Sequence, residues 1–114
     1  MQRYALALDL KDDPALIAEY EAYHRGVWPE ILHSIHEAGI LRMEIYRYAN
    51  RLFLLMETTN DFSLEAKAAA DAANPKVQAW EALMWRYQQA LPGAKPGEKW
   101  QRMEKIFETE ETTF

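Results

Sequence analysis

The side chains best suited to proton transfer in this sequence lie in the stretch 20–31. Tyr20 and His24 are four residues apart, so on a helix they lie on one face, one turn apart. His24 can donate and accept protons near neutral pH, and Tyr20 can hydrogen-bond a hydroxyl group of a ligand. A new helix begins at Trp28-Pro29, because proline fits the first helical turn. The stretch therefore has the residues for acid–base chemistry beside a break between two helices.

On the residues alone, a structural interpretation of the same side chains stays open. A histidine at the end of a helix can interact with the free carbonyl groups there. Tyr20 and Trp80 lie on apolar stripes, which is the usual pattern of core residues. If the site is functional, Trp28 or Trp80 could stack on a sugar, because the C–H-rich faces of sugars are apolar. A packed helix corner with one polar residue would give the same pattern.

Other kinds of catalytic site find no support in the sequence. There are no cysteines, which excludes disulfides, thiolate nucleophiles and cysteine-based metal sites. The four glycines do not form the G-x-G-x-x-G spacing of a nucleotide-binding loop, and no serine has the context of a nucleophile elbow. His33 and His36 have a spacing that a metal could use, but no nearby side chain clearly completes a site. We therefore expect neither a metal nor a cofactor, and non-covalent acid–base chemistry remains.

Length and composition predict a single domain that spans residues 1–114. Apolar residues make up 49% of the chain, enough to build a core. The net charge of −5 comes without a basic cluster, which argues against nucleic acid and anionic membranes as partners. The N-terminus lacks the features of a signal peptide, and no apolar run is long enough to cross a bilayer. We expect a soluble, cytoplasmic protein.

Hydrophobic periodicity and turn residues predict the order of the elements. The expected strands span 3–10, 40–48, 51–58 and 100–108, and the expected helices span 14–24, 28–38, 63–73 and 75–90. Gly39 is placed to end the second helix in a left-handed cap, and Asn50 is expected to provide the positive φ of the hairpin connection. Ile106 and Phe107 are the expected apolar anchors of the last strand, and 108–114 is expected to be a C-terminal tail.

This order is that of the ferredoxin-like α+β fold, with a four-stranded antiparallel sheet and helices on one face. Met, Phe and Leu occur on both faces of the expected strands. The sheet face without helices must therefore be covered by a partner or line a cavity. A homodimer formed through sheet faces or edges is the expected arrangement.

The combination Tyr20-x-x-x-His24 followed by Val27-Trp28-Pro29-Glu30 resembles the signature of the L-rhamnose mutarotase family. The similarity covers nearly the full length of the chain. Further matching segments are Ile45-Tyr46, Asn50 to Phe53, Met56-Glu57, Gln78-Ala-Trp80 with Met84, Leu91-Pro92, and the final strand to Phe107.

The resemblance implies a dimeric α+β barrel that interconverts the α and β anomers of a 6-deoxy-L-hexose without cofactor or metal. It implies that His24 is the catalytic histidine and that Tyr20 contacts the sugar beside it. Trp80 corresponds to the first of two adjacent tryptophans that bind the sugar in this family.

Two positions depart from the family pattern. Glu81 stands where the second tryptophan is found, and Met43 stands where a tyrosine contacts the substrate. The proton-transfer residues are therefore kept while the sugar-contacting residues differ, which leaves L-rhamnose and L-fucose as competing substrates. Two other functions on the same fold stay open: a non-catalytic module that binds a small ligand, and a cofactor-free oxygenase, for which the sequence offers only the fold.

Overall fold

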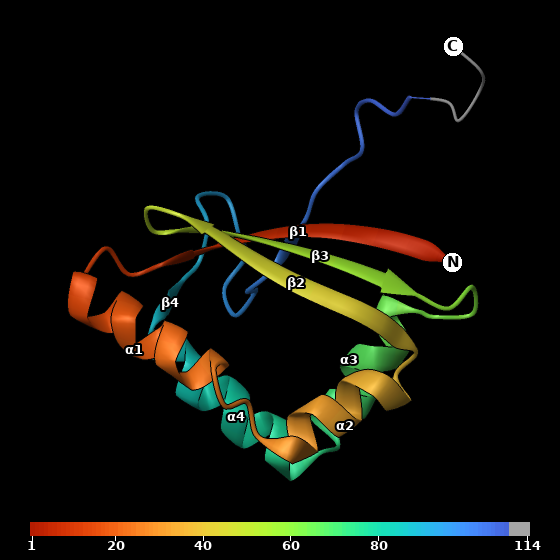
Figure 1. The fold of residues 1–114 in the computed structure, drawn as a ribbon, viewed down its shortest axis with the longest axis horizontal. Coiled ribbons are helices and arrows are strands. Elements are labelled where there is room, and N and C mark those ends of the chain that lie inside the picture. The colour runs from red at the N-terminus through yellow and green to blue at the C-terminus, as the bar shows by residue number, and fades with distance from the viewer. Residues whose placement is uncertain (110–114) are drawn as a thin grey trace.

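The computed structural model describes residues 1–109 of the chain. In Figure 1 the helices all lie on one side of a twisted sheet, and the segment after the last strand leaves the body on the other side. The strands are β1 (Gln2–Leu10), β2 (Ile40–Tyr48), β3 (Arg51–Thr58), β4 (Gln88–Gln89) and β5 (Gln101–Arg102). The helices are α1 (Pro14–His24), α2 (Pro29–Glu37), α3 (Leu64–Ala72) and α4 (Pro75–Trp85).

The sheet has the order β2-β3-β1-β4, and all of its pairings are antiparallel. This is the strand order of the ferredoxin-like fold, so the predicted α+β fold class is confirmed. The last strand differs from the expectation, because two short strands share the outer edge of β1. Gln88 and Gln89 pair with its end, and Gln101 and Arg102 pair with its middle.

Two predicted elements near the C-terminus were wrong in extent. The helix expected over 75–90 ends at Trp85, because the chain turns at Arg86 and Gln88 then pairs with Leu10 of β1. The strand expected over 100–108 pairs only at 101–102, and the expected anchors Ile106 and Phe107 are exposed. Residues 110–114 of the expected tail lie outside the described residues.

The core lies between the sheet and the helices. Along β1 the side chains alternate, so Leu6, Leu8 and Leu10 are buried under the helices. Their partners across the pairing with β3, Leu54 and Leu52 among them, are buried on the same face. The larger of two core clusters joins β1 and β3 to α1, α2 and α4, and its members are Leu10, Tyr20, Ile31, Leu52, Val77, Trp80, Met84 and Tyr87.

The hairpin connection between β2 and β3 does not use the residue that we expected. The positive φ falls on Ala49, at 51°, whereas Asn50 was predicted to adopt it. Asn50 instead joins the turn to the end of β1: its Nδ2 donates to the Leu10 carbonyl at 3.1 Å, and its carbonyl accepts from the Leu10 N–H at 2.7 Å. Ala49 and Asn50 form a two-residue turn between the paired Tyr48 and Arg51, and in one common type of such turns the positive φ falls on the first residue alone.

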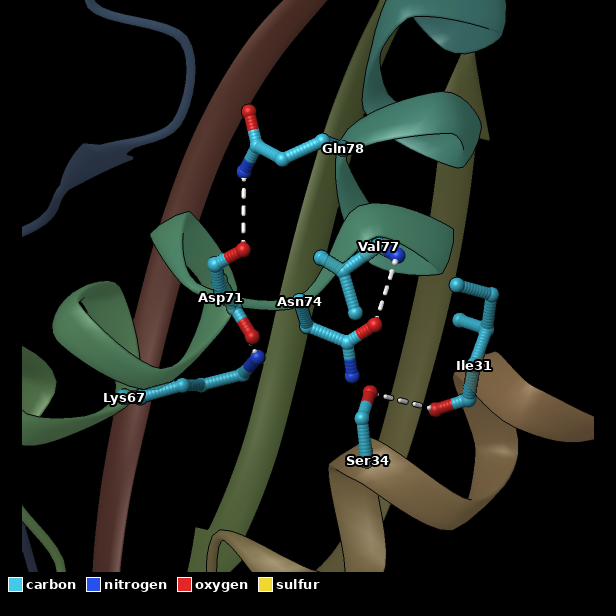
Figure 2. A network of polar contacts seen from close by, with 7 residues as sticks. All are labelled: Ile31, Ser34, Lys67, Asp71, Asn74, Val77 and Gln78. Atoms are coloured by element: carbon cyan, nitrogen blue, oxygen red, sulfur yellow. Dashed lines mark hydrogen bonds and ion pairs between the residues drawn. The ribbon is translucent and has the colours of Figure 1, made fainter.

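A polar network sets where α4 begins (Figure 2). Asn74 caps the helix by accepting a hydrogen bond from the Val77 N–H at 3.3 Å. The Gln78 side chain reaches back and donates to the Asp71 carbonyl at 2.9 Å. The Asp71 carboxylate in turn pairs with Lys67 at 2.7 Å. These contacts lock the end of α3 to the start of α4, which directs the apolar face of α4 toward α1 and α2.

The turn at Gly39 leaves no room for a side chain, which can be tested by mutation. Gly39 has a φ of 95°, and a Cβ added there would lie 2.7 Å from the Thr59 Oγ1. We expect Gly39→Ala to lower the free energy of unfolding by at least about 1–2 kcal/mol, measured by urea denaturation. Gly26→Ala is the matched control, because a Cβ at Gly26 meets nothing within 4 Å. Equal stability of the two variants would contradict this description of the turn.

Candidate active site

A cavity of about 290 Å³ lies between the C-terminal half of α1 and the strands β2 and β3. Its helix wall is polar and its sheet wall is apolar apart from one arginine. The lining residues are Tyr20, Glu21, His24 and Arg25 from the helix side and Ile45, Arg47 and Leu52 from the sheet. Tyr20 and His24, the predicted catalytic residues, are therefore brought together in one cavity.

The His24 ring is held in one orientation by its own helix. Its Nδ1 lies 2.8 Å from the Tyr20 carbonyl oxygen. A carbonyl can only accept, so Nδ1 carries the hydrogen in this contact and a neutral ring has its acceptor at Nε2. His24 thus makes the contact with a helix carbonyl that a structural role predicts. This contact uses Nδ1 and leaves Nε2 for a ligand.

Tyr20 lies against the His24 ring, with the ring centroids 4.3 Å apart. Its side chain is only 3% exposed, although it contributes to the cavity wall. Burial raises the pKa of the Tyr20 hydroxyl above its ordinary value, and a hydrogen bond from the Gln88 side chain opposes this shift. The hydroxyl therefore keeps its proton at neutral pH and can donate a hydrogen bond.

The two predicted tryptophans lie behind His24 and do not line the cavity. Trp80 is 8% exposed, and its ring is 5.7 Å from the His24 ring in an edge-on arrangement. Trp28 packs edge-on against Trp80 at 5.1 Å. Edge-to-face aromatic contacts of this kind favour a defined geometry, so the pair supports the position of the histidine ring.

Met43 and Glu81, the expected sugar-selecting positions, also lie away from this cavity. Met43 is opposite Met56 in the sheet and packs against the second core cluster. The Glu81 carbonyl accepts a hydrogen bond from Lys99 Nζ at 2.8 Å, and this ammonium also lies over the Trp85 ring. Burial lowers the pKa of Lys99, while the charge of Glu81 acts in the opposite direction.

The charged residues of the cavity and one buried amide, Gln88, were not predicted from the sequence. Arg47 had a usable signal, since it follows Met43 and Ile45 at intervals of two and therefore shares their sheet face. Gln88 had none, because the apolar spacing placed it inside a helix. It is buried in β4, and within residues 1–109 its Oε1 has no hydrogen-bond partner.

The described part of the chain contains neither a membrane-length helix nor a metal-binding cluster. Among residues 1–109, no group of three or more His, Asp or Glu side chains could hold a metal ion. His33, one of the two histidines with metal-compatible spacing, instead contacts Glu37 at 2.9 Å. No helix in this range is long and apolar enough to cross a membrane.

Comparison with known proteins places the chain in a family. Residues 3–109 match the sequence profile of the L-rhamnose mutarotase family. The chain belongs to this family. The resemblance predicted from the sequence is thereby confirmed over almost the whole described length.

Relatives of the chain are named for different sugars, L-fucose or L-rhamnose. An L-fucose mutarotase of Xanthomonas campestris is 55% identical over 109 residues, which cover 94% of this chain and 87% of that protein. An L-rhamnose mutarotase of a Jannaschia species is 30% identical over 98 residues, which cover 84% of this chain and 88% of that protein. The crystal structure of an L-rhamnose mutarotase from Formosa agariphila has the same fold, with a TM-score of 0.71, 22% identity and coverage of 96% of this chain and all of that one.

The raised pKa of Tyr20 predicts a pH dependence of the folding stability. A raised tyrosine pKa means that the folded state binds the proton more tightly than the unfolded state, whose phenol titrates near 10.0. The stability that this group contributes is therefore complete below pH 10 and is lost as the pH rises toward the higher folded pKa. We expect the free energy of unfolding of the wild type to fall more steeply above pH 10 than that of Tyr20→Phe. Parallel pH profiles in urea denaturation would contradict the burial of this hydroxyl.

Proposed function

We propose that this protein is an aldose mutarotase that interconverts the α and β anomers of a 6-deoxy-L-hexose. The observation that carries the proposal is the pair of Tyr20 and His24 in one cavity, in a chain of the L-rhamnose mutarotase family. L-Fucose is the first candidate substrate and L-rhamnose the second. The 55% identity to an L-fucose mutarotase, against 30% to an L-rhamnose mutarotase, supports this order.

Ring opening and ring closure each need two proton transfers, and neither changes an oxidation state. A base takes the proton from the anomeric hydroxyl while an acid delivers a proton to the ring oxygen. The bond between C1 and the ring oxygen breaks, and the open-chain aldehyde forms. Rotation about the C1–C2 bond and the reverse transfers close the ring on the other face. The intermediate is uncharged, so positioned side chains can carry the whole cycle.

The geometry of the cavity fits these two roles. With Nδ1 bonded to the Tyr20 carbonyl, His24 can accept the anomeric proton at Nε2. The protonated Tyr20 hydroxyl, or a water molecule beside it, can donate to the ring oxygen. Positioned proton transfer contributes about 10² to 10⁴-fold in rate, which is sufficient for a reaction that also proceeds without an enzyme.

We also propose that the protein forms a homodimer through the sheet face that carries no helices (Figure 1). Phe53 and Leu55 of β3 are half-buried there, beside the Tyr46 ring, which is 53% exposed and lies 6.1 Å from the Phe53 ring. The pair of Asp9 and Arg51, at 2.7 Å, lies at the end of the same face. An apolar centre with ion pairs at its rim is the usual composition of a protein interface.

The cytoplasmic location stays a prediction of the sequence. Fractionation of cells that produce the protein would check it, and recovery of the protein outside the cytoplasm would contradict it.

The proposed role of His24 can be tested by replacing its imidazole. We expect His24→Asn to lose about 10²-fold or more in anomer exchange, measured by saturation-transfer NMR on L-fucose and on L-rhamnose. The replacement keeps a polar side chain but removes the ring nitrogen that is proposed to accept the anomeric proton. His33→Asn is the matched control, because His33 is exposed and lies outside the cavity.

Two outcomes would contradict the proposal. Wild-type exchange rates in His24→Asn would remove the catalytic role of this residue. A wild-type protein that binds the sugars without accelerating their exchange would favour the non-catalytic ligand-binding module.

The proposed dimer interface can be tested at Phe53, on the sheet face that carries no helices. We expect Phe53→Asp to convert the dimer to a monomer, because it buries a charge at the centre of the interface. The molar mass in solution, measured by light scattering after size exclusion, decides the outcome. Leu32→Asp is the control, since Leu32 is an exposed apolar residue on α2, in the helix layer. A monomeric wild type, or a Phe53→Asp variant that remains dimeric, would contradict the proposed interface.

A further inference from the structure

Three charged side chains of the cavity, Glu21, Arg25 and Arg47, have no part in the proton transfers, and two of them form an ion pair. Glu21 of α1 and Arg47 of β2 both line the wall beside Tyr20 and His24. Arg47 Nε lies 3.4 Å from the Glu21 Oε2, and the two side chains are 35% and 46% exposed. An ion pair this exposed contributes little to folding stability, so its place in the cavity calls for another explanation.

The Arg47 guanidinium is oriented by the hairpin turn as well as by Glu21. Its NH1 donates to the Ala49 carbonyl at 2.8 Å. Ala49 is the residue with a φ of 51°, a conformation that non-glycine residues seldom adopt and that is concentrated at functional sites. The Ala49 carbonyl that accepts this hydrogen bond therefore belongs to a residue in the left-handed conformation. A guanidinium has five N–H donors, and these two contacts leave further donors for a ligand.

The sheet wall of the cavity offers a sugar few other polar partners. Besides Arg47, it consists of Ile45 and Leu52, which cannot hydrogen-bond. A hydroxyl group that is buried against apolar side chains without a partner weakens binding. Tyr20 and His24 serve the helix side, where the ring oxygen and anomeric hydroxyl would lie. Hydroxyls on the sheet side can therefore be satisfied by Arg47, and Glu21 faces it from the helix.

The same pair also borders a second hollow of about 340 Å³ between the start of α1 and the β2–β3 turn. Asp12, Pro14, Ile17, Ala18, Glu21, Arg47 and Ala49 line this hollow. Glu21 and Arg47 are the residues common to the walls of both hollows. They thus lie between the two hollows, within reach of a ligand that occupies either one.

We propose that Arg47 and Glu21 bind neighbouring hydroxyl groups of the sugar and select among 6-deoxy-L-hexoses. Arg47 donates to one hydroxyl oxygen, and Glu21 accepts from a second hydroxyl. L-Fucose and L-rhamnose differ in the orientation of the hydroxyls at C2 and C4, and a pair held in place by the turn discriminates between such orientations. This selection rests on the proposed mutarotase function and gives Arg47 and Glu21 the role that the sequence suggested for Met43 and Glu81.

The test measures binding and turnover separately. NMR titration with L-fucose and with L-rhamnose gives the affinities, and saturation transfer between the anomeric protons gives the exchange rates. We expect Arg47→Gln to weaken binding of L-fucose by about tenfold to a hundredfold, the loss typical of one hydrogen bond to a charged group. We also expect the ratio of the L-fucose to the L-rhamnose exchange rate to fall in this variant.

Matched controls separate this effect from a general change of charge. Arg42→Gln removes the same charge from the same strand, but Arg42 lies on the opposite sheet face and pairs with Glu44. Glu19→Gln is the corresponding control for Glu21→Gln, since Glu19 lies on α1 outside the lining of the cavity. Both controls are expected to bind L-fucose like the wild type, and thermal unfolding checks that every variant is folded.

The outcomes distinguish the inference from the function on which it rests. If Arg47→Gln binds L-fucose with the wild-type affinity and keeps the wild-type ratio of exchange rates, the inference is overturned while the mutarotase function stands. Loss of affinity with an unchanged ratio overturns the selective role. If the wild type binds L-fucose without exchanging its anomers, the mutarotase function fails, and weaker binding by Arg47→Gln still supports the sugar-binding role.

Discussion

Side chains alternate along β1 and β3, and the helices pack on only one of the two faces that this alternation creates. Every second residue of these strands is consequently buried, and Leu8 and Leu10 are completely so. The other face keeps Phe53 and Leu55 half-buried with no helix above them. One-sided packing therefore leaves two features: a cavity under α1 and a second sheet face on which apolar side chains stay partly exposed.

The cavity owes its chemistry to the end of α1. The last turn of this helix bends the His24 ring back onto the Tyr20 carbonyl, which determines the ring nitrogen that stays free. Trp80, fixed by the cap at the start of α4, packs edge-on against the same ring. The His24 ring is thus positioned by ordinary helix geometry and core packing. A structural and a catalytic role for His24 are compatible, although the sequence presented them as alternatives.

Local signals predicted most of the fold. The bounds of α1, β2 and β3 agree with the expectation, because proline and capping residues mark the helix starts and the strands alternate clearly. The prediction was wrong where pairing depends on distant residues. Tyr87 continues the apolar spacing of α4, yet the backbone leaves the helix at Arg86 to reach the edge of β1. Two-residue strands carry no periodic signal, so β4 and β5 could not be recognised locally.

The residues of the site were predictable only in part, for a related reason. Tyr20 and His24 lie on one helix, so their spacing alone brings them together. Met43, Ile45 and Arg47 share one face of β2, but the sequence cannot tell which of them lies under His24, since that depends on where α1 crosses the sheet. In the folded chain Ile45 and Arg47 border the cavity and Met43 packs elsewhere.

We propose that a 6-deoxy-L-hexose binds between α1 and β2, with its anomeric carbon at His24 and its hydroxyls toward Arg47. A crystal structure of the protein soaked with L-fucose tests this most directly. We expect the anomeric hydroxyl or the ring oxygen within hydrogen-bond distance of His24 Nε2, and another hydroxyl within that distance of the Arg47 guanidinium. A sugar bound outside this cavity, or bound in it with the anomeric carbon turned away from His24, would contradict the proposed roles of His24 and Arg47.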